Sequence, residues 1–256
     1  MRLMSLFDLL KSYIKQDRAV ALAVIVRGPQ ELLGTKAVIP DNDPPAGPLL
    51  ETPWAGQILS DARDLLRYRT TDSRRYGPAG KYADGIEVFF DVHRPSPRLI
   101  IVGGVHIAVD LVHFARPLGF TTYLVDPRTV FASPERFPHV DHIINRWPDE
   151  ALPEIGLTGD TAVVTVTHDP KIDDPALLVA LPSQAFYVGA LGSTRTNALR
   201  LERLRQAGLT QAQIDRLHAP IGLDIGRRDP TEIALGIIAE IVAVRNGSPL
   251  VAEKDG

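Results

Sequence analysis

The chain of 256 residues contains no cysteine. Disulfide bonds, thiolate metal sites, a cysteine nucleophile and a cysteine sulfur carrier are therefore excluded within this chain. The absence of cysteine agrees with a reducing compartment, and we expect a cytoplasmic protein.

Strong net charge and long apolar runs are missing as well. The formal net charge is −3 at pH 7, so no basic field points to nucleic acid or to anionic lipid. A membrane span needs about 20 consecutive apolar residues, and the sequence has no such run. The apolar spacing over residues 3–14 predicts an amphipathic helix, whose charges argue against a signal peptide. We expect a protein that binds neither nucleic acid nor a membrane.

From Arg98 onward the sequence alternates regularly between apolar strands and helical segments. The predicted strands are 98–103, 120–126, 141–145, 161–169 and 185–192, and the predicted helices are 106–119, 173–181, two short ones within 201–220, and one from Pro230 to Gly247. Apolar strands separated by helices indicate a parallel sheet covered on both faces. The sequence therefore predicts a Rossmann-like α/β domain over residues 98–247, with ligands at the carboxyl ends of its strands.

The preceding residues predict a smaller α+β domain over 1–94. Dense apolar runs beginning at Ala19 and Gly34 are typical of strands, "WAGQILSDARDLLRYR" predicts a helix, and "GIEVFFDVHRPSP" predicts a strand that ends in a linker. The proline-rich segment "PDNDPPAGP" is incompatible with regular structure. We place the domain boundary between Arg94 and Pro97.

The segment "GGVHIA" lies between a predicted strand and a predicted helix, where a dinucleotide fingerprint belongs. Gly103 and Gly104 supply the turn, Ala108 fills the last small-residue position, and Asp126 ends the next strand, where a ribose hydroxyl would bind. Val105 occupies the position of the second glycine, and a left-handed backbone there costs a β-branched residue about 1–2 kcal/mol. A nucleotide site and a bare Rossmann-like turn both stay open at this point.

Polar residues follow the next predicted strand of the sheet. Thr167, His168 and Asp169 end the strand that begins at Thr161, so we expect them to face the ligand crevice. His168 and Asp169 suit contact with a phosphate or a pterin, or the handling of a proton. The structural alternative is a turn in which Asp169 caps the next helix.

Three further segments supply candidate binding residues. In "GALGSTRTN", Gly192, Ser193 and Arg195 predict an anion site at a helix start, and the alternative is that Ser193 only caps the helix. The loop "PIGLDIGRRDP" contributes Asp224. His106 begins the first Rossmann helix, and it either faces the crevice or is an ordinary exposed histidine.

A metal site is not expected from the histidines. His139 and His142 are close in sequence, but His142 opens a predicted strand, so the two side chains need not converge. Neither a Ser-His-Asp elbow, a Walker loop nor a zinc helix is present.

The segment from Arg98 to Gly247 resembles the XdhC/CoxI family of accessory proteins for xanthine dehydrogenase and related molybdenum hydroxylases. Four blocks carry the resemblance: "GGVHIA", "VTHDPKIDDPAL", "YVGALGSTRT" and "PIGLDIGRRDPTEIALGIIAEIVA". The resemblance implies binding of the molybdenum cofactor, its protection during sulfuration, and its insertion into an apo-enzyme, with a cysteine desulfurase as a further partner and a homodimer left open.

The chain departs from the family pattern in two places. The family's first loop reads G-A-G-H, so Val105 replaces a glycine while His106 is retained. The family's N-terminal domain has a glycine-cysteine-glutamate stretch, and the corresponding "ETPWAGQILSDAR" has no cysteine. A thiolate ligand from this chain is thus impossible, and the chain looks like a divergent member of the family it resembles.

Our leading hypothesis is a non-catalytic accessory protein that holds molybdenum cofactor or a nucleotide in the Rossmann-like crevice. The expected binding residues are Gly103, Gly104, His106, Asp126, Thr167, His168, Asp169, Gly192, Ser193, Arg195 and Asp224. One alternative is an NAD(P)-dependent oxidoreductase, for which His168 is the available proton donor and against which Val105 argues. The other is a ligandless module that bridges partner proteins.

Overall fold

A computed structural model describes residues 5–77, 85–226 and 229–250. The chain divides between Pro95 and Ser96 into two compact units, which we describe separately. Among the described residues, no helix combines the length and apolarity that crossing a bilayer requires.

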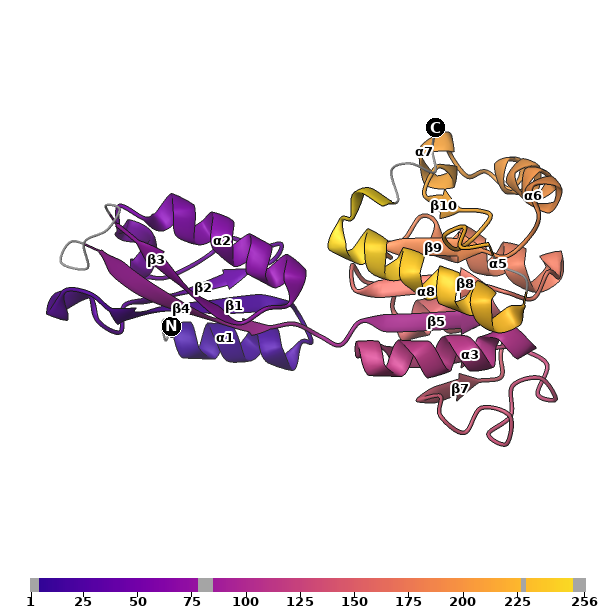
Figure 1. The fold of residues 1–256 in the computed structure, drawn as a ribbon, viewed down its shortest axis with the longest axis horizontal. Coiled ribbons are helices and arrows are strands. Elements are labelled where there is room, and N and C mark those ends of the chain that lie inside the picture. The colour runs from indigo at the N-terminus through magenta and orange to yellow at the C-terminus, as the bar shows by residue number, and fades with distance from the viewer. Residues whose placement is uncertain (1–4, 78–84, 227–228, 251–256) are drawn as a thin grey trace. The chain divides into compact units, whose positions relative to one another are not determined.

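The N-terminal unit is built on an antiparallel sheet with the strand order β2-β1-β4-β3 (Figure 1). Its elements are α1 (Leu6–Lys15), β1 (Val20–Arg27), β2 (Lys36–Pro40), α2 (Ala55–Tyr68), β3 (Asp72–Tyr76) and β4 (Ile86–His93), with short 3-10 turns at Gln30–Leu32 and Pro48–Glu51. Alternate residues of β1 face opposite sides of the sheet. One side packs against α2 and the other packs against α1.

The strand β3 was not expected from the sequence. Its residues, "DSRRY", are mostly polar, and it forms the edge of the sheet by pairing with β4. An edge strand has one neighbour only, so its sequence need not show the apolar pattern of a central strand. The helices and the other three strands lie where the sequence predicts them.

The C-terminal unit contains a six-stranded parallel sheet, which confirms the predicted α/β class. The strands are β5 (Arg98–Val102), β6 (Thr121–Val125), β7 (His142–Ile144), β8 (Thr161–Thr165), β9 (Tyr187–Ala190) and β10 (Leu217–His218). The helices are α3 (His106–Ala115), α4 (Pro148–Ile155), α5 (Pro170–Ala180), α6 (Thr194–Gln206), α7 (Gln211–Ile214) and α8 (Pro230–Asn246), with a 3-10 turn at Arg116–Leu118. The order β10-β9-β8-β5-β6-β7 is that of a Rossmann sheet.

Two apolar layers enclose this sheet. Leu99 and Ile101 of β5 face the side covered by α3 and α8, while Ile100 and Val102 face the side of α4 and α5. In Figure 1, α3 and α8 lie next to each other in front of the strands. Burial on both faces explains why these strands show no polar alternation.

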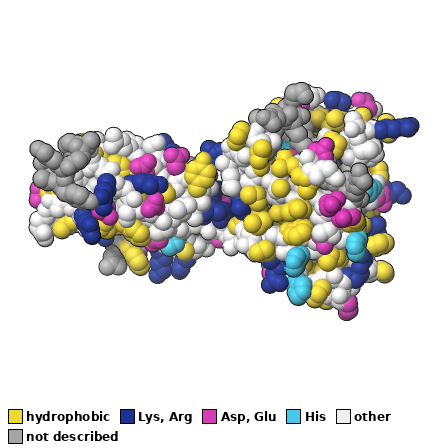
Figure 2. Space-filling view, viewed as in Figure 1, with side chains coloured by type: hydrophobic (Ala, Val, Ile, Leu, Met, Phe, Trp, Pro, Cys, Tyr) yellow, Lys and Arg dark blue, Asp and Glu magenta, His cyan; other side chains and the backbone are white. Residues whose placement is uncertain are grey.

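The helix α8 has the predicted ends. Asp229 is its N-cap and accepts a hydrogen bond from the Glu232 N–H at 2.9 Å, and Gly247 is its left-handed C-cap. Figure 2 shows hydrophobic side chains gathered on the face of this unit where Figure 1 has α8 in front. Leu235 on α8 is 47% exposed and Val109 on α3 is 38% exposed.

The starts of two helices in this unit were predicted wrongly, and two short elements were not predicted. α5 begins at Pro170, three residues before the predicted start at Asp173, so Pro175 lies inside the helix. α6 is a helix of 13 residues that starts at Thr194, well before the predicted one. The elements α4 and β10 were not expected, because α4 contains the internal Pro153 and β10 has only 2 residues.

The chain reverses its direction of travel across the sheet between β5 and β8. From β5 the chain moves outward through β6 and β7, and it then returns to the other side of β5 to add β8, β9 and β10. In open α/β sheets, ligands bind outside the carboxyl ends of the strands at such a switch point. A ligand-binding site is therefore expected at the loops after β5, β8 and β9.

Candidate binding crevice

The loops after β5 and β8 touch at the switch point. Gly103 has a φ of +116°, and a Cβ atom at this position would lie 2.4 Å from the Thr167 Cγ2. Only glycine fits both the backbone conformation and this close approach. The predicted site residues Gly103 and Thr167 are thus brought together by packing of the protein against itself.

Gly104 is also explained by a contact within the chain. A Cβ atom here would lie 2.4 Å from the Phe131 carbonyl oxygen, in the loop after β6. Val105, the residue that breaks the fingerprint, has an extended backbone with φ −87° and ψ 174°. The left-handed strain considered from the sequence therefore does not arise, and the valine packs against the core. Val105 is the N-cap of α3, but valine has no side-chain oxygen, so it makes no capping hydrogen bond to the helix.

Asp126 is fully buried at the end of β6 and is held by its own neighbours. One carboxylate oxygen accepts from the Gly104 N–H at 2.8 Å and from the Arg128 guanidinium at 2.8 Å, and the other accepts from the Arg128 N–H and Nε, both at 2.9 Å. Burial alone would raise the pKa of Asp126, but the bonds from Arg128 and Gly104 outweigh it and hold the pKa below its ordinary value. These four bonds match the capacity of a carboxylate.

The loop after β8 presents His168 to solvent. His168 has a φ of +61°, an unusual conformation for a residue other than glycine. Asp169 is the N-cap of α5 and accepts from the Lys171 N–H at 3.0 Å. The helix cap that the sequence offered as an alternative role for Asp169 is therefore observed. Thr167 donates its hydroxyl to Asp173 at 2.6 Å and accepts from the Asp169 N–H at 3.0 Å.

The loop after β9 leads directly into α6. Ser193 is the N-cap of α6 and accepts from the Thr196 N–H at 3.2 Å. Arg195 lies exposed in the first turn of the helix. The capping role expected as an alternative for Ser193 is therefore observed, and its hydroxyl also lies at 3.0 Å from the Thr196 Oγ1.

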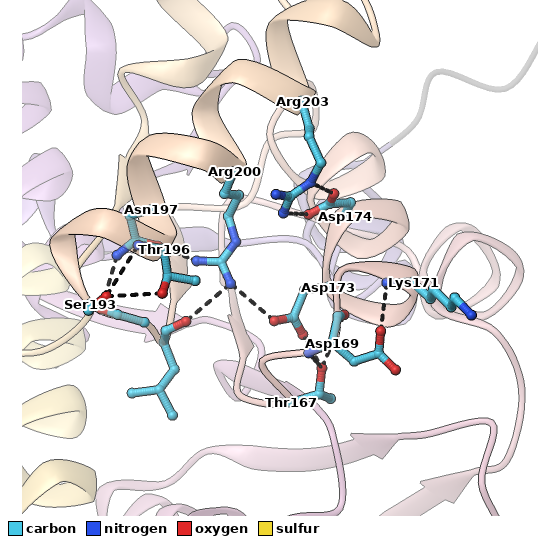
Figure 3. A network of polar contacts seen from close by, with 12 residues as sticks. Thr167, Asp169, Lys171, Asp173, Asp174, Ser193, Thr196, Asn197, Arg200 and Arg203 are labelled. Atoms are coloured by element: carbon cyan, nitrogen blue, oxygen red, sulfur yellow. Dashed lines mark hydrogen bonds and ion pairs between the residues drawn. The ribbon is translucent and has the colours of Figure 1, made fainter.

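A buried ion pair beneath these two loops was not found from the sequence. The side chains of Asp173 on α5 and Arg200 on α6 are 0% and 2% exposed, and the Asp173 Oδ2 lies 3.1 Å from an Arg200 guanidinium nitrogen (Figure 3). Arg200 also donates to the Leu191 carbonyl at 3.1 Å and to Asn197, which in turn donates to the Gly192 carbonyl at 3.1 Å. Asp173 lies within the segment "VTHDPKIDDPAL" and Arg200 follows the segment "YVGALGSTRT". Neither segment contains a pattern that predicts the burial of the two side chains against each other.

A cleft of about 320 Å³ opens beside the loops after β8 and β9. It is lined by His168, Leu191, Gly192, Ser193, Pro220, Ile221 and Ile233. Three of the predicted site residues, His168, Gly192 and Ser193, line it directly. This volume lies at the lower end of the range for small-molecule sites.

The part of the cleft wall formed by Pro220 and Ile221 lies next to a segment that Glu240 holds in place. The fully buried Glu240 accepts from the Gly222 N–H and from the Tyr187 hydroxyl, each at 2.6 Å, which fixes the start of the loop after β10. Asp224 lies further along that loop, is exposed, and accepts from the Gly226 N–H at 3.2 Å. The other predicted residues are not part of the cleft lining: Gly103, Gly104, His106, Asp126, Thr167, Asp169, Arg195 and Asp224.

The histidines do not assemble a metal centre in the described ranges. No group of three or more His, Asp or Glu side chains there has a metal-binding arrangement. The ring of His142 stacks on Tyr123 with centroids 4.4 Å apart, and Asp141 accepts two hydrogen bonds from Thr122, at 2.7 and 2.8 Å.

The sheet order defines a Rossmann-type domain. It differs from a dinucleotide-binding domain in its modified glycine loop and in the position of its cleft, beside β8 and β9. Residues 99–241, more than half of the chain, match the XdhC Rossmann domain. The chain belongs to this family.

The chain is similar to three curated proteins over about 160 residues. It is 33% identical to the uncharacterized protein YqeB of Escherichia coli K12 over 64% of this chain, and 30% identical to a probable xanthine dehydrogenase subunit of Bacillus subtilis 168 over 62%. It is 32% identical to the molybdenum cofactor insertion chaperone PaoD of Escherichia coli K12 over 63%. The matched segment spans 30%, 46% and 43% of the length of these relatives, in that order.

A solved structure supports the fold of the whole chain. It is described as a xanthine dehydrogenase from Bacillus halodurans, and it superposes with a TM-score of 0.53 over 97% of this chain and 99% of that one. The sequences are 20% identical, so this likeness concerns the fold alone.

Proposed function

We propose that this chain is an accessory protein in the maturation of a molybdenum hydroxylase, and that the cleft beside β8 and β9 holds the molybdenum cofactor. The observation that carries the proposal is the position of the family's sequence blocks. Residues from "VTHDPKIDDPAL", "YVGALGSTRT" and "PIGLDIG" line one cleft at the carboxyl end of a parallel sheet. The names of two relatives, a cofactor insertion chaperone and a xanthine dehydrogenase subunit, support the assignment.

The residues of the cleft suit a flat, polar-edged ring system that carries a phosphate. Leu191, Pro220, Ile221 and Ile233 provide apolar walls for a planar ring, while His168 offers a polar group at the rim. Arg195, exposed in the first turn of α6, suits a phosphate by charge and by its forked donors.

The chain would contribute binding and shielding in this role. When bound, the cofactor supplies the molybdenum centre that the target enzyme uses. Because the chain has no cysteine, no thiolate of this protein competes for the metal, and release to an apo-enzyme requires no metal–thiolate bond of this chain to be broken. A cysteine desulfurase and the apo-hydroxylase are the partners that this role requires.

The contacts around the glycine loop favour this function over NAD(P)-dependent oxidation. Both Asp126 oxygens are used by Arg128 and Gly104, so the acidic residue that would bind a ribose hydroxyl has no remaining capacity. Val105 stands where the dinucleotide fingerprint has the glycine that lets the backbone approach a pyrophosphate.

The test is binding of molybdenum cofactor, released from a purified molybdoenzyme, to the full chain. We expect Arg195→Ala and His168→Asn each to weaken binding by about tenfold or more, since the first removes the guanidinium and the second replaces the imidazole by a shorter amide. Asparagine tolerates the left-handed backbone of His168, so the fold is preserved. Arg205→Ala, at the other end of α6, and His113→Asn, on α3, are the matched controls.

Three results would separate the hypotheses. Cofactor binding that survives both cleft variants would contradict the proposed site. Binding of NADH or NADPH in place of molybdenum cofactor would favour the oxidoreductase. Activation of an apo-hydroxylase that is indifferent to every cleft variant would favour a ligandless interaction module.

A further inference from the structure

The buried pair Asp173–Arg200 lies at the junction of the two loops that line the cleft. Asp173 holds the loop after β8, because its Oδ1 accepts the Thr167 hydroxyl at 2.6 Å and Thr167 in turn accepts the Asp169 N–H. Arg200 holds the loop after β9, through the Leu191 carbonyl at 3.1 Å. The two holding residues are joined to each other at 3.1 Å (Figure 3).

The network extends to both neighbours of the cleft. Asn197 links the Arg200 guanidinium to the Gly192 carbonyl, which is itself part of the cleft lining. On the other side, Thr167 packs against Gly103, so the loop after β5 is in contact with the same group. The Arg200 guanidinium is therefore linked to all three loops at the switch point, directly to the loop after β9 and through Asp173 and Thr167 to the loops after β8 and β5.

Stability alone is a weak explanation for this pair. Removing two charges from water is costly, and apolar pairs of similar volume often replace buried ion pairs without loss of stability. Burial raises the pKa of Asp173 above its ordinary value, while the Thr167 hydroxyl and the Arg200 charge oppose that shift. A planar, forked guanidinium can bind several oxygens at fixed angles, which an apolar side chain cannot do.

We infer that Asp173 and Arg200 are positioning residues that set the width of the cleft, by fixing the loop 167–169 relative to the loop 191–193. This inference rests on the proposed function for the ligand, but the positioning itself is a property of the free protein. In the proposed site His168 and Ser193 line the cleft and Arg195 lies in the first turn of α6, so the buried pair would act on the ligand through the loops that carry them.

The chain contains a matched control for this inference. Asp174 and Arg203 are one residue further along α5 and three further along α6, and they also join these two helices, with an Arg203 guanidinium nitrogen 3.0 Å from the Asp174 Oδ1. Their side chains are 16% and 38% exposed, and both of their described bonds run to each other and not to a loop carbonyl. They link the helices without touching the cleft loops.

The experiment compares two double variants of the full chain by amide hydrogen exchange. In Asp173→Leu/Arg200→Met, we expect exchange at 167–169 and 191–193 to rise by about tenfold or more, with less than a twofold change in β5. In Asp174→Leu/Arg203→Met, both loops should exchange as in the unmodified protein. Arg200→Lys, which keeps the charge but loses the fork, should give an intermediate rise and serves if the first double variant does not fold.

Affinity for molybdenum cofactor then tests the link to the ligand. We expect the Asp173/Arg200 double variant to bind about tenfold more weakly and the Asp174/Arg203 variant to bind normally. Unchanged exchange in both loops would overturn the inference whatever the ligand result. Faster exchange with unchanged affinity would overturn the link to binding. An unmodified chain that binds no cofactor would refute the proposed function, and the exchange data would still decide whether the pair positions the loops.

Discussion

The two halves of the crevice use similar residues in opposite ways. In the β5–β6 half, formed by the loops after β5 and β6, the glycine turn and the acidic residue Asp126 make their contacts with other groups of the chain. Gly104 accommodates the Phe131 carbonyl and Asp126 binds Arg128. In the β8–β9 half, formed by the loops after β8 and β9, the polar loops border an open cleft. A glycine-rich turn after a strand therefore indicates that another group lies close to its backbone. The structure shows whether that group belongs to the chain itself or whether the space is open.

The largest expected effect comes from filling the space beside Gly104 in the β5–β6 half. In Gly104→Ala, the new Cβ would lie 2.4 Å from the Phe131 carbonyl oxygen and 2.6 Å from its carbon, and backbone cannot yield as a flexible side chain does. We expect a loss of about 3 kcal/mol in the free energy of unfolding, measured by urea denaturation. Gly159→Ala is the control, because nothing lies within 4 Å of its Cβ position, and its change should stay within about 0.5 kcal/mol. Equal stability of the two variants would refute the packing role of Gly104.

The second prediction concerns the charge of Asp126. Asp126→Asn removes the carboxylate that accepts from Arg128 and Gly104, and we expect it to lower the free energy of unfolding by about 2 kcal/mol at pH 7. Asp224→Asn, in an exposed loop near the β8–β9 half, is the control and should change stability by less than about 0.5 kcal/mol. Urea denaturation of both variants provides the comparison.

The pH dependence of Asp126 has a definite sign. Its pKa is depressed in the folded protein, so the stability that it contributes is complete above the unfolded pKa of about 4 and is lost as the pH falls through the folded pKa. The Asp126→Asn variant should therefore lose less stability than the unmodified chain between pH 5 and pH 2. Identical pH profiles would mean that Asp126 does not titrate differently in the two states.

Much of the C-terminal unit could be predicted because its signals are local. Apolar strands such as β5 and β8 are buried on both faces, and the start of α8 carries Asp229, Pro230 and Glu232 in the order that a helix requires. The carboxyl ends of parallel strands meet at one edge, so the strand-end residues His168 and Ser193 could be expected near one another.

The rest depended on contacts between distant residues. Asp173 and Arg200 are separated by 27 positions, and their burial results from the packing of α5 on α6, which no local pattern reports. Arg128 binds the Asp126 carboxylate, and no sequence motif around Arg128 predicts this contact. Asp169 and Ser193 show the same limit, because an N-cap and a ligand contact call for the same residue types.

The smallest expected effect separates those two roles at Ser193. An aspartate caps a helix as well as a serine does, so Ser193→Asp should leave the free energy of unfolding within about 0.5 kcal/mol of the unmodified value, while Ser193→Ala should lose about 1 kcal/mol. The added negative charge would oppose an anionic ligand at the start of α6, and we expect Ser193→Asp to weaken binding of molybdenum cofactor several-fold. Thr210→Asp, at the N-cap of α7 and outside the cleft lining, should alter neither quantity appreciably. If Ser193→Asp binds the cofactor as well as the unmodified chain does, then no anionic group of the ligand lies at the start of α6, and Ser193 acts as a helix cap alone.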